Sequence, residues 1–335
     1  MIKKKEQYID ALEKEIIKRY KGEVLSTLYF GGGTPSLLKL NDFSKIINLF
    51  NINSNTEITA EINPEISDKE YLRGLKNLGI NRLSIGCQTF NNNILQNIGR
   101  RHSSDDVKKV VEYANNAGFS NISIDLIYGL PEQTIKMFEY DLNKAIELDI
   151  KHISLYGLKI EENCYFYNHK PQNIPDDDIQ ADMYLKAIEI TEQNGFEHYE
   201  ISNFAKHGYE SKHNLNYWNN SSYYGFGVAA HGYENGIRYS NTTNLEKYIK
   251  NPLEHEYLHK LSPTEQIEEE IFLGFRKSSG IDINKIKNEY KIDFNKEYKY
   301  ILKKYSDYIE KTQQGYKFNK NGFLISNTIL SEFIQ

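Results

Sequence analysis

The sequence is poor in cysteine and contains no long apolar run. Its 335 residues include two cysteines, Cys87 and Cys164, which are too few for a disulfide framework and too far apart for a local thiolate cage. The longest apolar segments, such as Leu25 to Phe30, have the length of a strand, and the lysine-rich start leads into charge and not into an apolar signal region. We therefore expect a cytoplasmic protein without an integral membrane segment.

The chain also lacks an excess of charge of either sign. Its 41 basic and 46 acidic residues give a formal net charge of −5, which provides no general attraction to nucleic acid or to an anionic membrane. Aromatic residues are abundant, with 26 tyrosines and 16 phenylalanines. An AT-rich genome explains this abundance more simply than a flat, π-rich ligand does. Composition therefore argues against a nucleic-acid partner.

Strand-length apolar runs alternate with helical patterns through the first half of the chain. An amphipathic helical pattern from Ile9 to Tyr20 precedes an apolar strand from Val24 to Phe30, which ends at the Gly31–Pro35 turn. Later strand-like runs end near Ala60-Glu61, Ile85-Gly86, Leu126-Ile127 and Leu155-Tyr156. Strands separated by helices predict right-handed crossovers and a parallel sheet, so the fold class is α/β.

Each predicted strand carries an unusual residue near its carboxyl end. These residues are the triple glycine, Glu61, Gln88, Asp125 and Tyr156. In a barrel of parallel strands the carboxyl ends converge on one mouth, where binding and catalytic groups lie. We therefore predict a TIM-like barrel with one site assembled from five strands, in preference to a doubly wound sheet.

The regular pattern stops after Tyr156. A helical pattern near Ile179 to Asn194 is followed by a strand-like run from His198 to Ser202 and by an irregular middle region. At Ser262 a capping box with Pro263 at the first helical position opens a small helical, winged-helix-like domain with a packing or interaction role. We expect a barrel core over 1–160, a barrel-completing region over 161–258 and the C-terminal domain over 259–335.

The glycine turn and two carboxylates are the first candidate binding groups. The Gly31–Pro35 turn leaves backbone N–H groups open to a ligand, although an ordinary tight turn explains it as well, and it lacks the features of a nucleotide-binding loop. Glu61 and Asp125 each interrupt an apolar strand, and a buried charge needs a partner. That partner is a ligand ammonium or ribose group, or else a structural ion pair with Arg82 or Arg100.

Other candidate binding residues give weaker evidence when each is taken alone. Gln88 can donate and accept hydrogen bonds, whereas Cys87 is predicted to be a buried packing thiol. The segment from His213 to Trp218 combines imidazole, amide and aromatic groups. Imidazole is a good axial ligand of haem iron and aromatic faces pack against a macrocycle, but the segment also suits a structural cap over the barrel.

A series of segments, taken in chain order, resembles the HemN/HemW family of radical S-adenosylmethionine (SAM) proteins over nearly the whole chain. The segments are YFGGGTPS, EINPE, RLSIGCQTF, IGRRH, IDLIYGLP, HYEISNFA, HNLNYW and GFGVAAHGY. HNLNYW is more similar to the haem-chaperone branch than to the oxygen-independent coproporphyrinogen III oxidase branch. The resemblance implies a partial (β/α)6 radical SAM barrel whose first strand is missing.

The resemblance also implies a set of site residues. By similarity, a SAM pocket would be lined by Gly32, Gly33, Thr34, Glu61, Gln88, Arg100, Asp125 and Lys159. The glycines and Thr34 would hold the methionine moiety, with Glu61 near its amino group. His213 would belong to a haem-binding motif.

The chain departs from the family at its start. Family members begin with a further strand and a CxxxCxxC loop that binds a [4Fe–4S] cluster, whereas this chain begins at the following helix. Cluster ligation needs several converging thiolates, so Cys87 and Cys164 cannot substitute, and we expect the cluster only in a full-length form. A miscalled start codon or a truncation explains the departure better than a degenerate natural homologue. The loss leaves one edge of the Leu25–Phe30 strand open.

The resemblance implies one main function and two alternatives. The main one is a haem chaperone that binds haem and passes it to an acceptor protein, with SAM and a cluster in the full-length form; peripheral contact with membrane-bound acceptors is compatible with it. The first alternative is an oxygen-independent coproporphyrinogen III oxidase of porphyrin biosynthesis, which requires the cysteine loop. The second is an inactive, cluster-free fragment.

Overall fold

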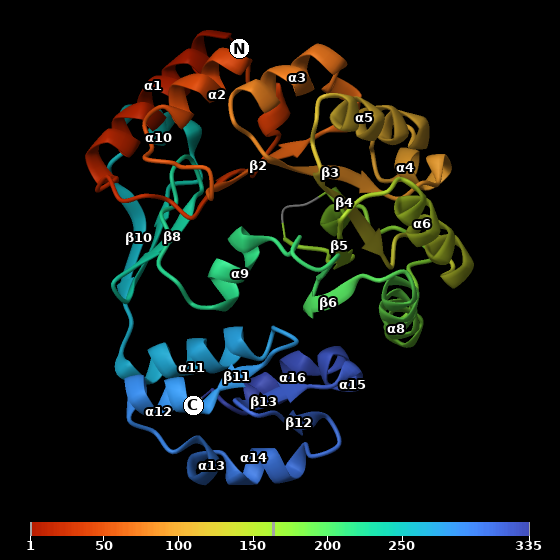
Figure 1. Ribbon diagram of the computed structural model, residues 1–335, viewed down its shortest axis with the longest axis vertical. Coiled ribbons are helices and arrows are strands. Elements are labelled where there is room, and N and C mark those ends of the chain that lie inside the picture. The colour runs from red at the N-terminus through yellow and green to blue at the C-terminus, as the bar shows by residue number, and fades with distance from the viewer. Residues whose placement is uncertain (1, 163–164, 335) are drawn as a thin grey trace. The chain divides into compact units, whose positions relative to one another are not determined.

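A seven-stranded sheet and two three-stranded sheets organise the chain, of which this computed structural model describes residues 2–162 and 165–334 (Figure 1). The chain forms two units that interleave in sequence. We call Thr27–Leu40 with Glu57–Ser211 the barrel unit. We call Met1–Ser26, Asn41–Thr56 and Lys212–Gln335 the companion unit. The three regions expected from sequence divide the chain differently and stay a prediction.

The barrel unit contains the seven-stranded sheet, with strand order β1-β2-β3-β4-β5-β7-β6. Its first strands are parallel and follow chain order: β1 (Thr27–Phe30), β2 (Glu57–Ile62), β3 (Arg82–Gln88), β4 (Asn121–Tyr128) and β5 (His152–Gly157). The hairpin of β6 (Glu197–Glu200) and β7 (Asn203–Ala205) joins β5 in antiparallel fashion. The sheet curls into a half-barrel, which confirms the predicted α/β barrel (Figure 1). Among the described residues β1 pairs with β2 alone, so it is an edge strand.

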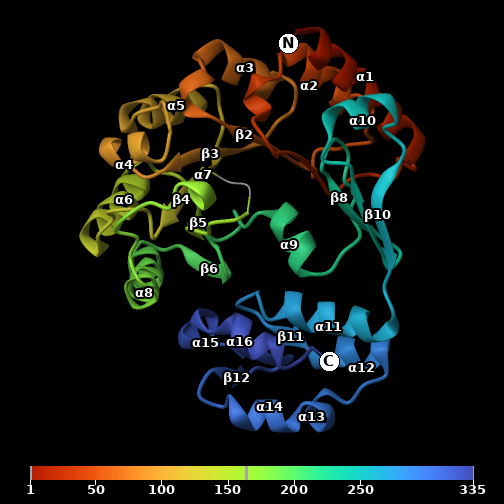
Figure 2. The ribbon, with the colours of Figure 1, turned by 180° about the vertical axis from the view of Figure 1, so that it is seen from behind.

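Helices between the strands cover one face of this sheet (Figures 1 and 2). They are η1 (Pro35–Leu37), η2 (Pro64–Ile66), α3 (Lys69–Asn77), α4 (Asn92–Asn97), α5 (Ser104–Asn116), α6 (Ile135–Glu147), α7 (Tyr165–Asn168) and α8 (Asp177–Gln193). Polar side chains cap the N-termini of several of these helices. Ser103 and Asp106 form a reciprocal capping box at α5, and Thr134 caps α6. Alternate strand positions such as Ile85 and Ile124, both 0% exposed, supply the apolar surface that amphipathic helices need.

The companion unit begins with α1 (Ile2–Arg19) and α2 (Leu40–Ile47). It continues with α9 (Lys212–Trp218), β8 (His231–Glu234), β9 (Ile237–Asn241), α10 (Leu245–Lys250) and β10 (His255–Lys260). The strands form an antiparallel sheet, so the expected irregular middle region was wrong. The strands are short and rich in polar residues, which hid them from apolar-pattern analysis.

A buried carboxylate ties α1 to the rest of the companion unit. Glu15 is 0% exposed and forms a salt bridge of 2.7 Å with Arg19. It also accepts hydrogen bonds from Asn241 Nδ2 at 2.7 Å, the backbone N–H of Gly227 at 2.9 Å and the Tyr248 hydroxyl at 2.5 Å. Accordingly, α1 lies beside α10 in both views (Figures 1 and 2). This charge is buried with its hydrogen-bonding capacity filled, as buried charges require.

The end of the companion unit is mainly helical. It comprises α11 (Pro263–Gly274), β11 (Ile281–Asp282), α12 (Ile283–Tyr290), α13 (Phe294–Glu297), α14 (Lys299–Lys304), β12 (Ile309–Lys311), β13 (Gly315–Phe318), α15 (Lys320–Leu324) and α16 (Ser326–Ser331). The strands form an antiparallel sheet in the order β11-β13-β12. Ser262 and Glu265 form the predicted capping box at α11. The helical C-terminal region agrees with the sequence expectation.

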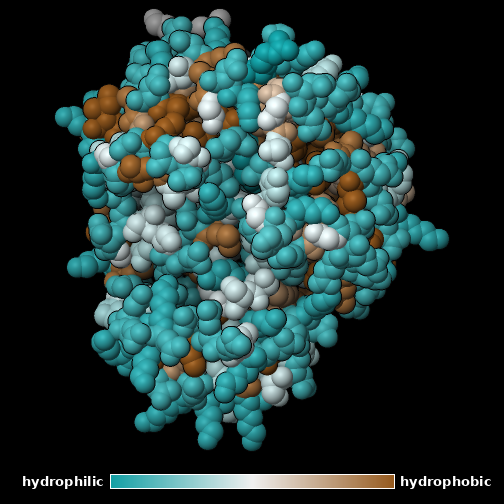
Figure 3. Space-filling model, viewed as in Figure 1, coloured by the Kyte–Doolittle hydropathy of each residue, from teal (hydrophilic) through white to brown (hydrophobic). Residues whose placement is uncertain are grey.

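Apolar side chains also reach the surface of the companion unit. Figure 3 shows hydrophobic side chains gathered over the region of α1, and Ile17 and Val24 are 64% and 52% exposed. None of the described helices combines the length and the apolar character needed to cross a membrane.

Candidate functional site

One face of the seven-stranded sheet is polar. Parallel register sets Glu61 beside Ser84 on β3, and sets Asp125 on β4 between Gly86 and Ser154. Because side chains two positions apart share a face, the row also includes Thr59, Arg82, Ser123 and His152. Most of these side chains are buried, so they must satisfy one another's hydrogen bonds or bind a ligand.

Glu61 lies at the carboxyl end of β2 between a tyrosine and the glycine turn. The Tyr29 hydroxyl donates to Glu61 Oε1 at 2.9 Å, and the backbone N–H of Gly32 donates to the same carboxylate. Burial raises the pKa of Glu61, the hydrogen bond from Tyr29 opposes the rise, and the negative charge of Asp125 adds to it. Both donors are uncharged. A ligand ammonium group would therefore stabilise the ionised form of Glu61.

The glycine turn beside Glu61 is open to ligands. Gly32 and Gly33 have φ angles of +73° and +41°, and a Cβ atom added to either would meet nothing within 4 Å. A Cβ on Gly31 would lie 2.4 Å from the Tyr29 ring and 2.9 Å from Glu61 Oε1. Thus Gly31 allows the close approach of Tyr29 and Glu61, while the exposed Gly32 and Gly33 present main chain to solvent. Thr34, also exposed, continues the turn.

Asp125 is surrounded by serine hydroxyls. Ser84 Oγ donates to its carboxylate at 2.9 Å and Ser123 Oγ at 3.4 Å, and Ser154 also forms a hydrogen bond with it. Burial raises the pKa of Asp125, while the hydrogen bonds from Ser154 and Ser84 and the positive charge of Arg82 oppose the rise. No direct salt bridge joins Asp125 to Arg82 in the described part of the chain. Sequence analysis missed all three serines.

Gln88 is held in an unusual backbone conformation. Its φ angle is +70°, and it is 8% exposed. The following turn is fixed by Asp141 of α6, which accepts hydrogen bonds from Phe90 N–H and Thr89 Oγ1, both at 2.7 Å, and from Gln133 Nε2 at 3.3 Å. Burial raises the pKa of Asp141 to about 6. Asp141 therefore positions the turn that carries Gln88.

The remaining predicted SAM residues lie in exposed loops. Arg100 follows α4 and is exposed. Lys159 follows β5, forms a salt bridge of 2.7 Å with Glu161 and has an 80% exposed side chain. Within residues 2–162 and 165–334, neither residue forms a hydrogen bond or a salt bridge with Glu61 or Asp125. The structure thus brings the glycine turn, Glu61, Gln88 and Asp125 to one edge of the sheet and leaves Arg100 and Lys159 outside that group.

His213 lies on α9 in the companion unit. Its Nε2 is 2.8 Å from the Tyr217 hydroxyl, and the two rings meet edge to face at 4.9 Å. Tyr217 in turn packs edge to face against Tyr223 at 4.6 Å. The indole N–H of Trp218 is buried and has no hydrogen-bond partner among the described residues. A half-buried imidazole therefore lies beside a cluster of aromatic rings.

Comparison with known proteins decides the family. The model of the radical SAM superfamily matches residues 2–145, and that of the HemN C-terminal domain matches residues 261–324. The chain is 38% identical to the heme chaperone HemW of Lactococcus lactis, over 98% of this chain and 90% of that protein. It is 37% identical to the heme chaperone HemW of Bacillus subtilis, over 98% of this chain and 91% of that protein. The chain belongs to the HemW family.

A solved structure supports the fold of this HemW-family chain. The radical SAM enzyme coproporphyrinogen III oxidase (HemN) of Escherichia coli superposes with a TM-score of 0.84 and 23% identity, covering 98% of this chain and 82% of that chain. At this identity the likeness shows the barrel fold alone. The family membership and the partial barrel inferred from the sequence segments are both confirmed.

The residues of this chain fit one cofactor of the superfamily, SAM, better than the other, the [4Fe–4S] cluster. The open glycine turn beside the Glu61 carboxylate fits the amino-acid part of SAM. Cys87 does not fit a [4Fe–4S] cluster, because it is 0% exposed and burial raises the pKa of its thiol well above the usual value, which disfavours the thiolate that ligates iron. This burial confirms the prediction for Cys87. Cys164 lies outside the described residues.

Proposed function

We propose that this HemW-family chain binds haem through α9 and passes it to an acceptor protein in the cytoplasm. The observation that carries the proposal is the half-buried imidazole of His213 beside Tyr217 and Tyr223, together with the indole N–H of Trp218, which has no hydrogen-bond partner in the described part of the chain. The naming of similar proteins as heme chaperones supports it.

The side chains of α9 supply what haem binding needs. Neutral imidazole is a haem-iron ligand, and His213 presents Nε2 to the Tyr217 hydroxyl, an uncharged partner that iron could replace. Burial raises the pKa of Tyr217 to about 12, so this hydroxyl stays protonated near neutral pH. The rings of Tyr217 and Tyr223 would pack against the apolar macrocycle.

The polar edge of the barrel is proposed to hold SAM. The N–H groups at Gly32, Gly33 and Thr34 would contact its methionine carboxylate, and Glu61 its ammonium group. Asp125 and Gln88 would bind the ribose and the adjoining parts of SAM. Arg100 and Lys159 would contact SAM from their loops. With a cluster, SAM supplies radical chemistry in this superfamily. Because buried Cys87 does not fit a cluster and two cysteines are too few to hold one, the chain's own residues are assigned only binding.

Haemin titration followed at the Soret band tests the haem proposal. We expect saturable binding by the wild-type chain, loss or strong weakening in His213→Ala, and no change in the control His207→Ala, whose side chain is 92% exposed. Wild-type protein that shows no saturable band would instead favour the inactive fragment.

Isothermal titration calorimetry with SAM tests the second site separately. Glu61→Gln should weaken binding because the neutral amide loses the attraction for the ammonium group. The control is Glu70→Gln on α3, where the glutamate side chain is 78% exposed. Equal affinities in these two variants would remove Glu61 from the SAM site.

A further inference from the structure

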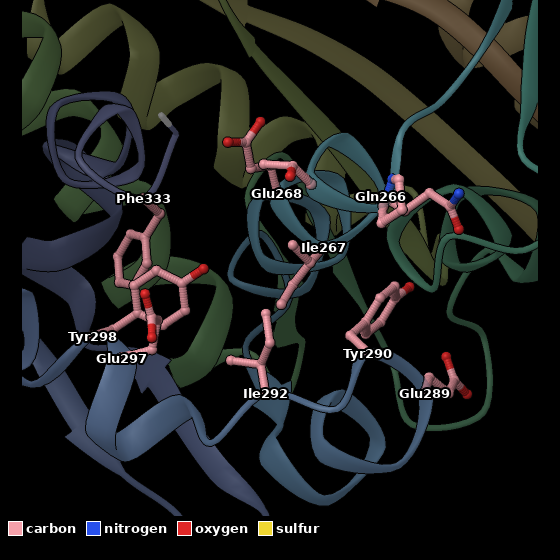
Figure 4. A pocket seen from close by; sticks show the side chains of 11 residues that line it. Gln266, Ile267, Glu268, Glu289, Tyr290, Ile292, Glu297, Tyr298 and Phe333 are labelled. Carbon is pink, nitrogen blue, oxygen red and sulfur yellow. The ribbon is translucent and has the colours of Figure 1, made fainter.

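A groove at the end of the companion unit belongs to neither site described above. It has a cavity volume of about 520 Å³ and is formed by α11, the ends of α12 and α13, the segment between them and the residue Phe333 after α16 (Figure 4). This volume lies within the range of specific binding pockets, about 300–1,000 Å³.

The floor of the groove is apolar and preformed. Ile267 and Phe333 are 4% and 1% exposed, and Ile292 is half-buried. The Phe333 ring packs against Tyr298 at 5.1 Å and Phe294 at 6.0 Å, so the floor is part of the local core. A ligand that covers this floor would gain from apolar burial without first ordering it.

The walls of the groove carry charge of one sign. Among the residues that the structure describes, its lining includes Glu268, Glu289 and Glu297 and no Lys, Arg or His residue. Figure 4 shows these carboxylates on different sides of Ile267 and Ile292. Glu289 and Glu297 are exposed. Glu289 lies in the last turn of α12, where the negative end of the helix dipole adds to its attraction for a cation and Lys287, which does not line the groove, opposes it.

The half-buried ring of Tyr290 adds to the preference for a cation, whereas the Tyr298 ring is 7% exposed and packs against Phe294 and Phe333. Tyr290 and Tyr298 line the groove, and burial raises the pKa of both hydroxyls. The negative charges of Glu297 and Glu268 contribute to the rise at Tyr298, which places both carboxylates close to this ring. Ammonium and guanidinium groups bind over tyrosine faces as well as to carboxylates.

We infer that this groove binds a segment of a partner protein in which lysine or arginine residues flank an apolar side chain. The apolar side chain covers Ile267 and Ile292, and the cationic groups reach the glutamates around them. A small polyamine would match the charges but leave the apolar floor in water, whereas an amphipathic segment matches both. The inference is independent of haem binding.

Fluorescence anisotropy with a model peptide tests the inference. The probe is a short fluorescein-labelled peptide with leucine and lysine at helical spacing, compared with a peptide in which glutamate replaces lysine. We expect the lysine peptide to bind and the glutamate peptide not to bind. Removing the charges with Glu268→Gln, Glu289→Gln and Glu297→Gln together should weaken binding about tenfold or more.

A second triple variant controls for net charge. Glu254→Gln, Asp307→Asn and Glu310→Gln remove the same charge from exposed positions outside the groove, and this variant should bind like wild type. Ile292→Ser should also weaken binding, by about tenfold, if the leucines cover the floor. Thermal melts followed by circular dichroism verify that each variant folds.

Four outcomes would overturn the inference. The first is that the lysine peptide does not bind to wild type, and the second is that the two peptides bind equally. The third is that the two triple variants weaken peptide binding equally. The fourth is that binding is unchanged in Ile292→Ser and that spermine displaces the peptide fully. The last result would assign the groove to a polyamine. Haemin titration of the same variants should match wild type, so failure here is distinguishable from failure of the haem proposal.

Discussion

Replacing Asp141 by asparagine should change how the stability of the fold depends on pH. Asp141 is 1% exposed and accepts hydrogen bonds from Thr89, Phe90 and Gln133. Burial raises the pKa of its carboxyl from 3.8 to about 6, so the fold binds a proton here more tightly than the unfolded chain does. The contribution of this group to stability is therefore fully present below pH 3.8 and is lost as pH rises through about 6.

The size of the effect follows from the pKa shift. A shift of about two units corresponds to about 3 kcal/mol between the acidic and the neutral limits. About 1.4 kcal/mol of this loss should fall between pH 5 and pH 7.5. Asp141→Asn removes the titrating group but keeps one acceptor oxygen for Phe90 N–H. The free energy of unfolding of Asp141→Asn should therefore rise relative to wild type by about 1.4 kcal/mol over that interval.

Urea denaturation at pH 5 and pH 7.5 measures this difference. Asp182→Asn, which changes an exposed residue of α8, is the matched control and should track wild type at both pH values. A constant stability difference between Asp141→Asn and wild type would refute the assignment of a buried, proton-binding carboxyl to this turn.

Other changes should have local and measurable effects. Glu15→Ala leaves buried donors around α1 without an acceptor and should lower the free energy of unfolding by about 3–5 kcal/mol, measured by urea denaturation; a loss below about 1 kcal/mol would contradict the role given to this carboxylate. Gly31→Ala should displace the Tyr29 ring and weaken SAM binding in calorimetry, and wild-type affinity would show that the turn relaxes freely. Cys87 should react with a thiol reagent only after denaturation, and fast modification in native buffer would show that it is accessible.

The predictable part of the site was the set of strand ends. Glu61 and Asp125 stood out in the sequence because each interrupts an apolar run, and Gln88 because its amide lies near the end of a predicted strand. The parallel register does bring them to one edge of the sheet. A further signal was present. Ser123 and Asp125 alternate with isoleucines on β4, as His152 and Ser154 do on β5, and this period of two marks a polar sheet face.

The rest depended on contacts between distant segments. Asp141 lies on a helix, and no local pattern shows that its carboxylate holds the turn after Gln88. Glu15 is similar, because all its hydrogen-bond partners described above except Arg19 come from residues 227–248. Lys159 was predicted through resemblance alone, whereas Arg100 was also considered as an ion-pair partner of the two carboxylates. Their exposed loops leave their roles in SAM binding as proposals.

The electron paramagnetic resonance spectrum of the haemin-loaded chain tests the central claim most directly, since it reports the ligand of ferric iron. Spectra of wild type, His213→Ala and His207→Ala should be compared at equal haemin loading. We predict a histidine-ligated signal in wild type and His207→Ala that is absent from His213→Ala. The same signal in all three proteins would contradict it.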